Sequence, residues 1–234
     1  MIIPEKKHLI NHNRTEKMKN IPRIFVGGNV KSGMIIPLDR DTVHYLTRVM
    51  RTDVAIVFGG GNEFNARVDA TQKNIVIGES TGRADPSGDI TLYFAPIKRT
   101  DDLINMATQL GVKKLVPVIT EHTTAQHINW ERMKKIATEA AEQSNRNSVP
   151  EITTPIKFSD IDLSKIAFAD ERAAHGATRE SHTKINSILV GPEGGFSDSE
   201  FATLDAADAV GISLGTTILR AELAAAIAIT KITK

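Results

Sequence analysis

Two glycine-rich segments carry the residues that are best placed to bind a ligand. The first, SILVGPEGGFSDSE, is an apolar run that leads through GPEGG at 191–195 into a sequence typical of a helix start. Glycines at the carboxyl end of a strand let the backbone approach a ligand closely and donate its amides. Taken alone, GPEGG is explained equally well as a tight turn, and it matches neither a P-loop nor a GxGxxG fingerprint.

The second segment, SLGTTILRAELAAAIA, repeats this arrangement. Gly215 ends an apolar run, and the predicted helix after it carries Arg220 and Glu222 in its first turns. An arginine donates to an anion and a glutamate accepts a proton, although a surface ion pair explains the two residues as well. Two strands that both end in glycine could line one crevice, and the alanines that follow allow close helix packing, in the core or against a second subunit.

Two polar clusters stand apart from these glycines. In EAAEQSNRN, a predicted helix ends among the hydrogen-bonding side chains of Gln143, Asn145 and Arg146, for which a polar helix cap is the simpler reading. In DTVHYLTRVMR, helical spacing places Val43, Leu46, Val49 and Met50 on one face. The same spacing places His44, Arg48 and Arg51 on another.

The elements that position these residues predict two domains after an extension at residues 1–20. Residues 21–84 contain short runs rich in Val, Ile and Phe between turn residues, typical of a small barrel or meander. Residues 85–234 alternate strands with helices, which predicts a parallel sheet with covered faces. Ser197 and Glu200 have capping-box spacing at a helix start. Helices are expected near 41–51, 100–111, 129–145, 197–208 and 218–233.

Composition narrows the function class. The net charge is only +1, but residues 1–51 hold ten Lys or Arg against four Asp or Glu, so the N-terminal part is basic and suits a polyanion. Without cysteine, the chain has no disulfide, thiolate metal site or cysteine nucleophile. His8 and His12 are four residues apart but have no third ligand nearby, and His122 and His127, five apart, do not share a helix face, so no metal is expected. The absence of a signal peptide or membrane span predicts a soluble, cytoplasmic protein.

Six strings in order resemble the RsmE family of small-subunit ribosomal RNA methyltransferases, over residues 21–231. They are IPRIFV, HYLTRVMR, LGVKKLVPVITEHT, KIATEAAEQSNR followed by VPEI, LVGPEGGFSDSE and SLGTTILRAELA. The resemblance implies an α/β protein: a SPOUT-type α/β trefoil-knot domain preceded by a small PUA-like β-barrel domain that binds RNA. It also implies a homodimer that uses S-adenosylmethionine to methylate N3 of a uridine in 16S ribosomal RNA, within the small ribosomal subunit.

The resemblance also implies roles for individual residues. Arg220 and Glu222 would be catalytic, with Glu222 either accepting the uracil proton or orienting Arg220. The expected RNA-binding residues are Arg23, His44, Arg48, Arg51, Gln143, Asn145 and Arg146. The expected cofactor-binding residues are Pro117, Val118, Thr120, Leu189, Gly191, Pro192, Glu193, Gly194, Gly195, Ser213, Leu214, Gly215, Ile218 and Leu219.

Three positions depart from the family pattern. Thr217 stands where an arginine is usual, Leu223 where a threonine is usual and Asn145 where a glycine is common. The loss of a cation at Thr217 keeps open a second reading, a non-catalytic RNA-binding or ribosome-assembly factor of the same fold. A third is an α/β enzyme that holds a phosphorylated metabolite on the GPEGG amides.

Overall fold

The computed structural model describes residues 21–124, 127–172 and 185–233, so the extension at 1–20, with His8 and His12, lies outside the described residues. The described residues form two compact units. The N-terminal unit contains residues 21–58 and 63–83, and the C-terminal unit contains 59–62 and the residues from 84 onward. In the described part of the chain, no helix is long and apolar enough to cross a membrane, and no cluster of acidic or histidine side chains could hold a metal ion.

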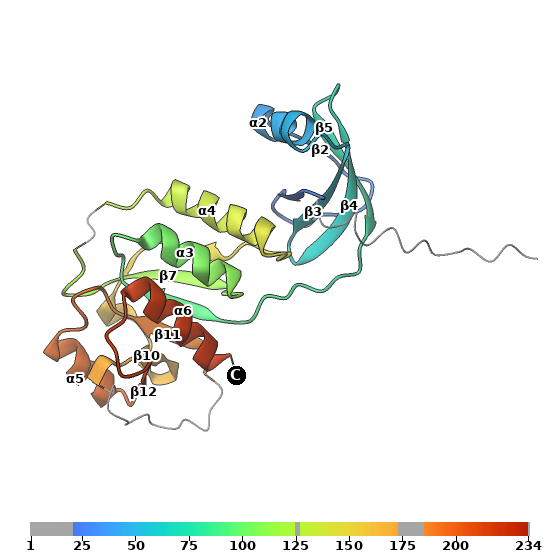
Figure 1. The fold of residues 1–234 in the computed structure, drawn as a ribbon. Helices are drawn as coiled ribbons and strands as arrows, with labels where there is room; N and C mark the ends of the chain where they lie inside the picture. Colours follow the sequence, from blue (N-terminus) through green and yellow to red (C-terminus); the bar gives the residue numbers. More distant parts are fainter. Residues whose placement is uncertain (1–20, 125–126, 173–184, 234) are drawn as a thin grey trace, which may run out of the picture. The chain divides into compact units, whose positions relative to one another are not determined.

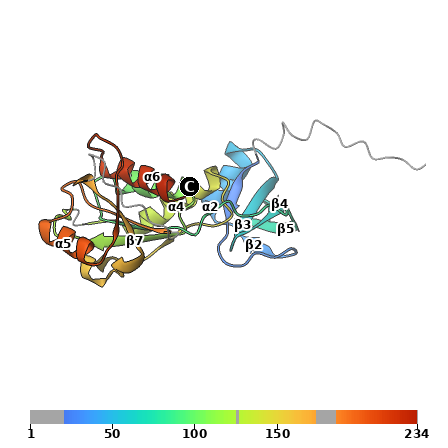
Figure 2. The ribbon, with the colours of Figure 1, turned by 90° about the horizontal axis from the view of Figure 1, so that it is seen from below.

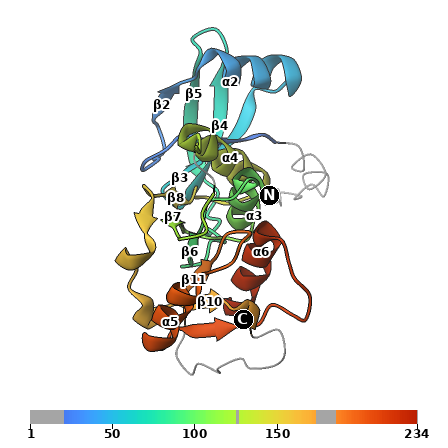
Figure 3. The ribbon, with the colours of Figure 1, turned by 90° about the vertical axis from the view of Figure 1, so that its left-hand side faces the viewer.

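The N-terminal unit is built on an open five-stranded sheet (Figure 3). Its strands are β1 (Arg23–Phe25), β2 (Ile35–Pro37), β3 (Val54–Gly59), β4 (Asn62–Asp69) and β5 (Asn74–Ser80), in the order β1-β3-β4-β5-β2. Alternate residues of the strands, such as Ala55 and Val57 on β3 and Ile75 and Ile77 on β5, point into one core. Because β1 and β2 are the two ends of this order, the sheet is a half-barrel rather than a closed ring.

A helix follows β2 and changes its type midway. It begins as α2 (Arg40–His44), capped by the Asp39 carboxylate, which accepts a hydrogen bond from the Thr42 amide at 2.7 Å. It continues as the π-helix η2 (Tyr45–Val49). Leu46 is fully buried, but 61% of Val49 is exposed, so the prediction of one apolar face containing both is wrong. Arg51 adopts a φ of 51° beyond the helix and therefore does not continue the face of His44 and Arg48.

The C-terminal unit contains a seven-stranded sheet whose pairings are all parallel. The order is β12-β10-β11-β6-β7-β8, and β9 also pairs with β7. The strands are β6 (Thr91–Phe94), β7 (Lys114–Ile119), β8 (Glu151–Ile152), β9 (Ile156–Lys157), β10 (Ala167–Ala169), β11 (Ser187–Val190) and β12 (Val210–Ile212). The expected α/β architecture is confirmed. The threading of the C-terminal segment into a knot stays a prediction.

Helices cover both faces of this sheet (Figures 1 and 2). On one face, α3 (Thr100–Gln109), α4 (Trp130–Gln143) and α6 (Ala221–Ile232) pack over Ile188 and Val190 of β11. On the other face, α5 (Asp198–Ala206) packs over Leu189, the residue between them. This alternation follows from the two-residue period of a strand. Two short 3-10 turns, η3 (Phe158–Asp160) and η4 (Leu163–Lys165), precede β10.

The observed starts of the helices can be compared with those predicted from the sequence. The capping box at Ser197 and Glu200 is present, which confirms the start of α5. Helix α6 begins later than predicted, at Ala221, and Arg220 is its N-cap residue. Residues 218–220 therefore belong to the loop before the helix, where they can face a ligand. At the start of α3, the Thr100 hydroxyl exchanges hydrogen bonds with the amide and the carbonyl of Ile97. The N-cap residue is Arg99.

A buried arginine joins three segments of the C-terminal unit. Arg146 is 2% exposed, and its guanidinium donates to the Thr108 carbonyl at 2.8 Å and to the Ser87 hydroxyl at 2.9 Å. The Asp85 carboxylate accepts hydrogen bonds from the amides of Ser87 and Asn147. Burial lowers the pKa of Arg146, and the charge of Asp85 partly offsets this effect. The network ties the segment at 85–88 to the ends of α3 and α4.

We expect Arg146→Ala to lower the free energy of unfolding by about 3–5 kcal/mol, because it leaves buried polar groups without their charged partner. The measurement is urea unfolding of the full chain. Lys135→Ala is the control, on the helix α4 that precedes Arg146, since the Lys135 side chain is 78% exposed. A loss of stability with Arg146→Ala no larger than that of the control would contradict this role.

Candidate functional site

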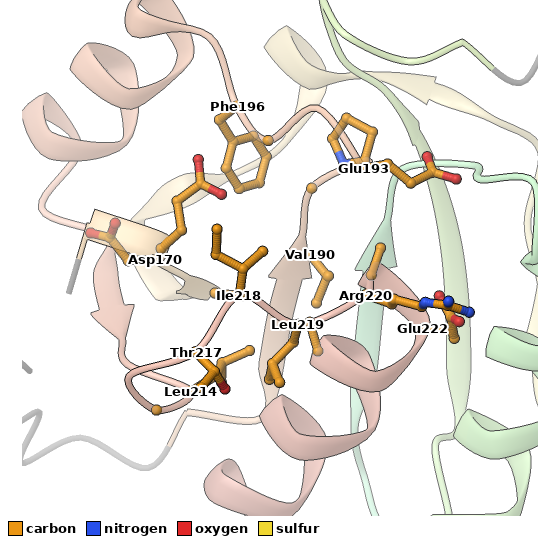
Figure 4. A pocket seen from close by; sticks show the side chains of 18 of the residues that line it. Asp170, Val190, Glu193, Phe196, Leu214, Thr217, Ile218, Leu219, Arg220 and Glu222 are labelled. Carbon is orange, nitrogen blue, oxygen red and sulfur yellow. The ribbon is translucent and has the colours of Figure 1, made fainter. Parts of the chain in front are cut away.

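A pocket of about 520 Å³ opens where four neighbouring parallel strands end (Figure 4). The loops that follow β6, β10, β11 and β12 all contribute to its lining. Apolar side chains form much of the wall, including Val190, Phe196, Leu214, Leu219 and Ala224. The carboxyl edge of an open parallel sheet is where such folds bind ligands, and the volume suits a small molecule.

The GPEGG loop after β11 needs its glycines for physical reasons. Gly195 has a φ of 70°, and a Cβ there would lie 2.5 Å from Oε1 of Glu171. A Cβ on Gly191 would meet the Phe196 ring at 3.2 Å. The loop is also held from behind, because the buried Glu200 accepts hydrogen bonds from the amides of Ser197 and Glu121, each at 2.9 Å. The loop is thus a braced element of the pocket wall.

The loop at 213–220 forms the opposite wall. Gly215 has a φ of 127°, which suits glycine, and its amide donates to the Ser213 hydroxyl at 3.3 Å. Lys231, in the last turn of α6, donates to the Ser213 carbonyl at 2.5 Å. Beyond this anchor, Ile218 is fully exposed on the pocket side of the loop (Figure 4). An apolar side chain left in solvent at a pocket is suited to contact a ligand.

Carboxylates at the end of β10 add charge to the pocket. Asp170 lines it and accepts hydrogen bonds at 2.9 Å from Arg172, which also bonds Asp205 at 3.0 Å. The guanidinium of Arg172 lies 4.0 Å from the centre of the Phe201 ring. Hydrogen bonds to Asp170 and then Asp205 raise the pKa of Arg172. This clamp fixes the position of Asp170 beside Glu171.

Glu222 and Arg220 lie on one side of the pocket but have different surroundings (Figure 4). The Glu222 side chain is only 9% exposed, and its carboxylate pairs with Arg99 at 3.3 Å. Arg99 also bonds Asp102 at 2.6 Å. Arg220 is exposed and makes no ion pair or hydrogen bond through its guanidinium with any described residue. The structure therefore partners Glu222 with Arg99, and the predicted orientation of Arg220 by Glu222 is not observed.

The structure brings together most of the predicted cofactor-binding residues. Those that line the pocket are Gly191, Pro192, Glu193, Gly195, Leu214, Gly215, Ile218 and Leu219, together with the two predicted catalytic residues. Those that do not are Pro117, Val118, Thr120, Leu189, Gly194 and Ser213.

The physical reasons for these exceptions lie in the sheet. Leu189 points to the face of the sheet that α5 covers, and Val118 is buried in the apolar cluster on that same face. The end of β7 lies one strand beyond β6, and Thr120 bonds to Thr123 there. The end of β7 supports the glycine loop from behind instead, through the Glu121 amide on Glu200.

Two of the predicted RNA-binding residues are engaged inside the protein. The Arg23 side chain is 10% exposed and pairs with Glu63, which also accepts from Arg83 at 2.6 Å. Burial opposes ionisation of Glu63, but the hydrogen bonds from Arg83, Arg23 and Thr81 outweigh it and lower its pKa. Arg146 is buried in the network described above. Both arginines are therefore structural, and their prediction as RNA contacts is corrected.

The other five predicted RNA-binding residues are exposed: His44, Arg48, Arg51, Gln143 and Asn145. Asn145 has a φ of 59° directly after α4. This left-handed conformation at a helix end is favoured by glycine and next by asparagine, which explains why asparagine can replace the common glycine.

Several pocket residues were missed from the sequence: Lys98, Arg99, Asp170, Glu171, Phe196 and Thr216. The signal that could have found most of them is present, because PIKR follows the strand β6 and DER follows β10. The same argument from strand ends that singled out the two glycine loops applies to these segments. What the sequence alone did not provide is the strand order, which places β6 and β10 on either side of β11.

Comparisons with known proteins agree with this geometry. A family model described as an RNA methyltransferase domain matches residues 84–233. Ribosomal RNA small subunit methyltransferase E of Rickettsia conorii is 34% identical over 229 residues, covering 90% of this chain and 94% of the relative. The protein of the same name from Synechocystis is 29% identical over 222 residues, covering 84% of this chain and 72% of the relative.

Solved structures are similar over the same range. The crystal structure of a ribosomal RNA small subunit methyltransferase E from Neisseria gonorrhoeae bound to S-adenosyl methionine has a TM-score of 0.77 at 26% identity, covering 91% of this chain and 97% of that one. A probable rRNA-methyltransferase from Porphyromonas gingivalis has a TM-score of 0.75 at 27% identity, with the same coverage. The likeness thus extends over both units of the chain.

The glycine loop gives a prediction that separates contact from backbone strain. Gly195 and Gly82 both have a φ of 70°, but a Cβ on Gly82 meets nothing within 4 Å. We expect Gly82→Ala to cost about 1 kcal/mol of stability through its left-handed conformation alone. Gly195→Ala adds the contact with Glu171 and should also weaken ligand binding in the pocket. Thermal unfolding and calorimetric titration measure the two effects, and equal ligand affinity in both variants would contradict the assignment.

Proposed function

This chain belongs to the RsmE family of ribosomal RNA small subunit methyltransferases, and on that premise we propose that it methylates N3 of a uridine in 16S ribosomal RNA with S-adenosylmethionine. The observation that carries the proposal is the pocket at the ends of β6, β10, β11 and β12. It has an apolar wall, two glycine loops and a group of charged side chains at one edge of the sheet.

The pocket residues fit the cofactor. Val190, Leu214 and Leu219 offer an apolar surface to an adenosine, and the glycine loops bring backbone amides close to it. The carboxylates of Asp170 and Glu171 suit a ligand that carries positive charge. When bound, S-adenosylmethionine supplies an electrophilic methyl group on a sulfonium. The residues that would hold it are those of 169–171, 190–193, 195–196 and 214–219.

The acceptor sets the chemical demands on the protein. Uracil N3 carries a proton and becomes a good nucleophile only when that proton leaves, and negative charge then develops on O2 and O4. The site therefore needs a donor for these oxygens and an acceptor for the proton. It must also align the two reactants, since displacement at a methyl group proceeds in line.

We assign the donor role to Arg220. Its guanidinium lies at the pocket and has no hydrogen bond or ion pair among the described residues, so it is available to a substrate oxygen. Its place as the N-cap residue of α6 puts it at the positive end of the helix, which also favours an anion. Neither feature requires a second arginine at Thr217.

We assign the proton-acceptor role to Glu222, with Arg99 as its positioning residue. The pair distance of 3.3 Å and the burial of Glu222 hold the carboxylate at one place in the pocket wall. Asp102 bonds Arg99 in turn, so Arg99 is itself held in place. Two functions are thus separated: Arg220 binds charge on the substrate, and Glu222 accepts a proton.

The proposal extends to the partners of the chain. We propose a homodimer formed through α6, because Leu223 on its first turn is 45% exposed and small alanines follow it.

The RNA substrate would contact the exposed His44, Arg48 and Arg51 and the end of α4 at Gln143 and Asn145. Since ribosomal RNA is modified where ribosomes assemble, the function implies a cytoplasmic location.

The experiment that tests the function is nucleoside mass spectrometry of ribosomal RNA from cells that lack this protein. We expect 3-methyluridine to disappear from 16S RNA and to return when the purified protein and S-adenosylmethionine are added to small ribosomal subunits from those cells. Calorimetric binding of the cofactor without methyl transfer would favour an assembly factor. No binding at all would favour an enzyme that takes another metabolite.

We expect Arg220→Ala to slow single-turnover methylation by about 100- to 1,000-fold, as is typical when one donor to a developing oxyanion is removed. Binding of S-adenosylmethionine should remain. Lys113→Ala is the matched control, because its side chain is 68% exposed, carries the same charge and is absent from the pocket lining. Full methylation activity in Arg220→Ala would show that the assigned role is wrong.

A further inference from the structure

An aromatic ring on the N-terminal unit is partly exposed and lies outside the apolar core of that unit. We propose that Tyr45, with Val49 beside it, is a stacking site for an unpaired base of RNA. Tyr45 is 42% exposed and Val49 is 61% exposed, both on η2. The inference deepens the proposed function, on which it rests for the identity of the ligand as RNA.

The helix geometry presents these two side chains together. The Met50 amide donates to the Tyr45 carbonyl at 2.9 Å, which is the five-residue spacing of a π-helix. Within this turn Leu46 is fully buried and anchors the helix to the core of the unit. Tyr45 and Val49 are four residues apart and are therefore neighbours on the helix surface. Single π-helical turns often occur at functional sites.

Folding does not account for the exposure of Tyr45. Among the described residues, its hydroxyl has no hydrogen-bond partner and its ring contacts no other aromatic ring. The unit has a complete core without it, built from Leu46, Ala55, Val57 and the residues that pack with them. An aromatic ring with an apolar neighbour, both in water, is suited to cover a flat apolar partner.

The charges around the ring point to a polyanion. Residues 42–52 include His44, Arg48 and Arg51 and contain no carboxylate. None of these three side chains makes an ion pair with a described residue, in contrast to Arg23 and Arg83 on Glu63. The carboxylates of this helix, Asp39 and Asp41, lie at its other end, where Asp39 caps it. The helix dipole accounts for basic side chains at the C-terminal end of the helix, but it does not account for the exposure of Tyr45 and Val49.

An unpaired nucleotide matches both features. Single-stranded RNA is bound by aromatic rings that stack on bases together with cations that hold the phosphates. A base in a duplex has no free face for Tyr45, so the site selects a loop or an opened strand. An acidic protein segment would satisfy the cations but not require the ring, and it is therefore the alternative that the experiment must exclude.

The experiment measures binding of the full-length protein to a single-stranded 12-nucleotide RNA that contains one 2-aminopurine. We expect Tyr45→Ala to weaken binding about 5- to 150-fold and to abolish the quenching of the base fluorescence. Because stacking releases no counterions, the slope of log affinity against log salt should not change. Arg48→Ala should instead reduce that slope by about 0.7, the value for one phosphate contact on a single strand.

Two controls make the result specific. Tyr45→Phe keeps the ring and should bind as the unchanged protein does, whereas Val76→Ala removes a similarly exposed side chain, 40% exposed on β5, and should have no effect. The KM for methylation of small ribosomal subunits should rise in Tyr45→Ala while kcat is kept. Unchanged RNA binding and KM in Tyr45→Ala would overturn the inference, as would equal losses in Tyr45→Phe and Tyr45→Ala.

Failure of the inference is distinguishable from failure of the proposed function. If Tyr45→Ala binds RNA normally while the protein methylates 16S RNA, only the stacking site is wrong. If the protein neither binds S-adenosylmethionine nor transfers a methyl group, but Tyr45→Ala loses RNA binding and quenching, the stacking site stands and the enzymatic function falls.

Discussion

The parallel pairing of β12, β10, β11 and β6 is the constraint on which the site depends. Parallel strands end at the same edge of a sheet, so four loops far apart in the sequence, at 95–99, 170–172, 191–197 and 213–220, are brought to one pocket. The chemical character of the site comes from what each loop carries. Two loops supply glycines, the loop after β10 supplies carboxylates and the loop after β6 supplies Arg99. A change of strand order would scatter these groups even if each loop were unchanged.

Burial decides which charged residues are structural. Arg23, Arg146 and Arg220 are the same residue type and were all predicted to bind substrate, yet the first two are almost inaccessible and hold carboxylates or carbonyls of the chain itself. A buried arginine that lost its partners would carry a large desolvation penalty, so its contacts are specific and lasting. Arg220, in contrast, is exposed, and its guanidinium bonds no described residue. Packing decides whether an arginine is structural or available to a ligand, and this cannot be predicted from residue type and spacing.

Most of the fold could be predicted from hydrophobic periodicity and capping signals, and the site only in part. The strand-ended loops at Gly191 and Gly215 were visible because glycine and apolar runs are local patterns. The pairing of Glu222 with Arg99 was not, because it joins residues more than 120 positions apart through the order of the strands. The π-helical turn at Tyr45 was also hidden, since a helix of regular period fits HYLTRVMR equally well. Local signals predict elements, and strand order and packing decide which side chains meet.

The two arginines at the pocket, Arg99 and Arg220, differ in their partners, and this difference bears on the proposed mechanism. Arg99 already has Glu222 and Asp102 as partners, so an arriving anion would have to compete with them. Arg220 has no ion pair among the described residues, so a substrate oxygen would not have to displace a partner. The attraction would strengthen as negative charge develops on that oxygen. Only interactions that are stronger in the transition state than in the ground state accelerate a reaction. Thr217 also lines the pocket but is neutral, so under the proposed function it would not share this role with Arg220. Under the proposed function, the electrostatic part of catalysis would therefore rest on Arg220, whereas Arg99 would hold the Glu222 carboxylate in place.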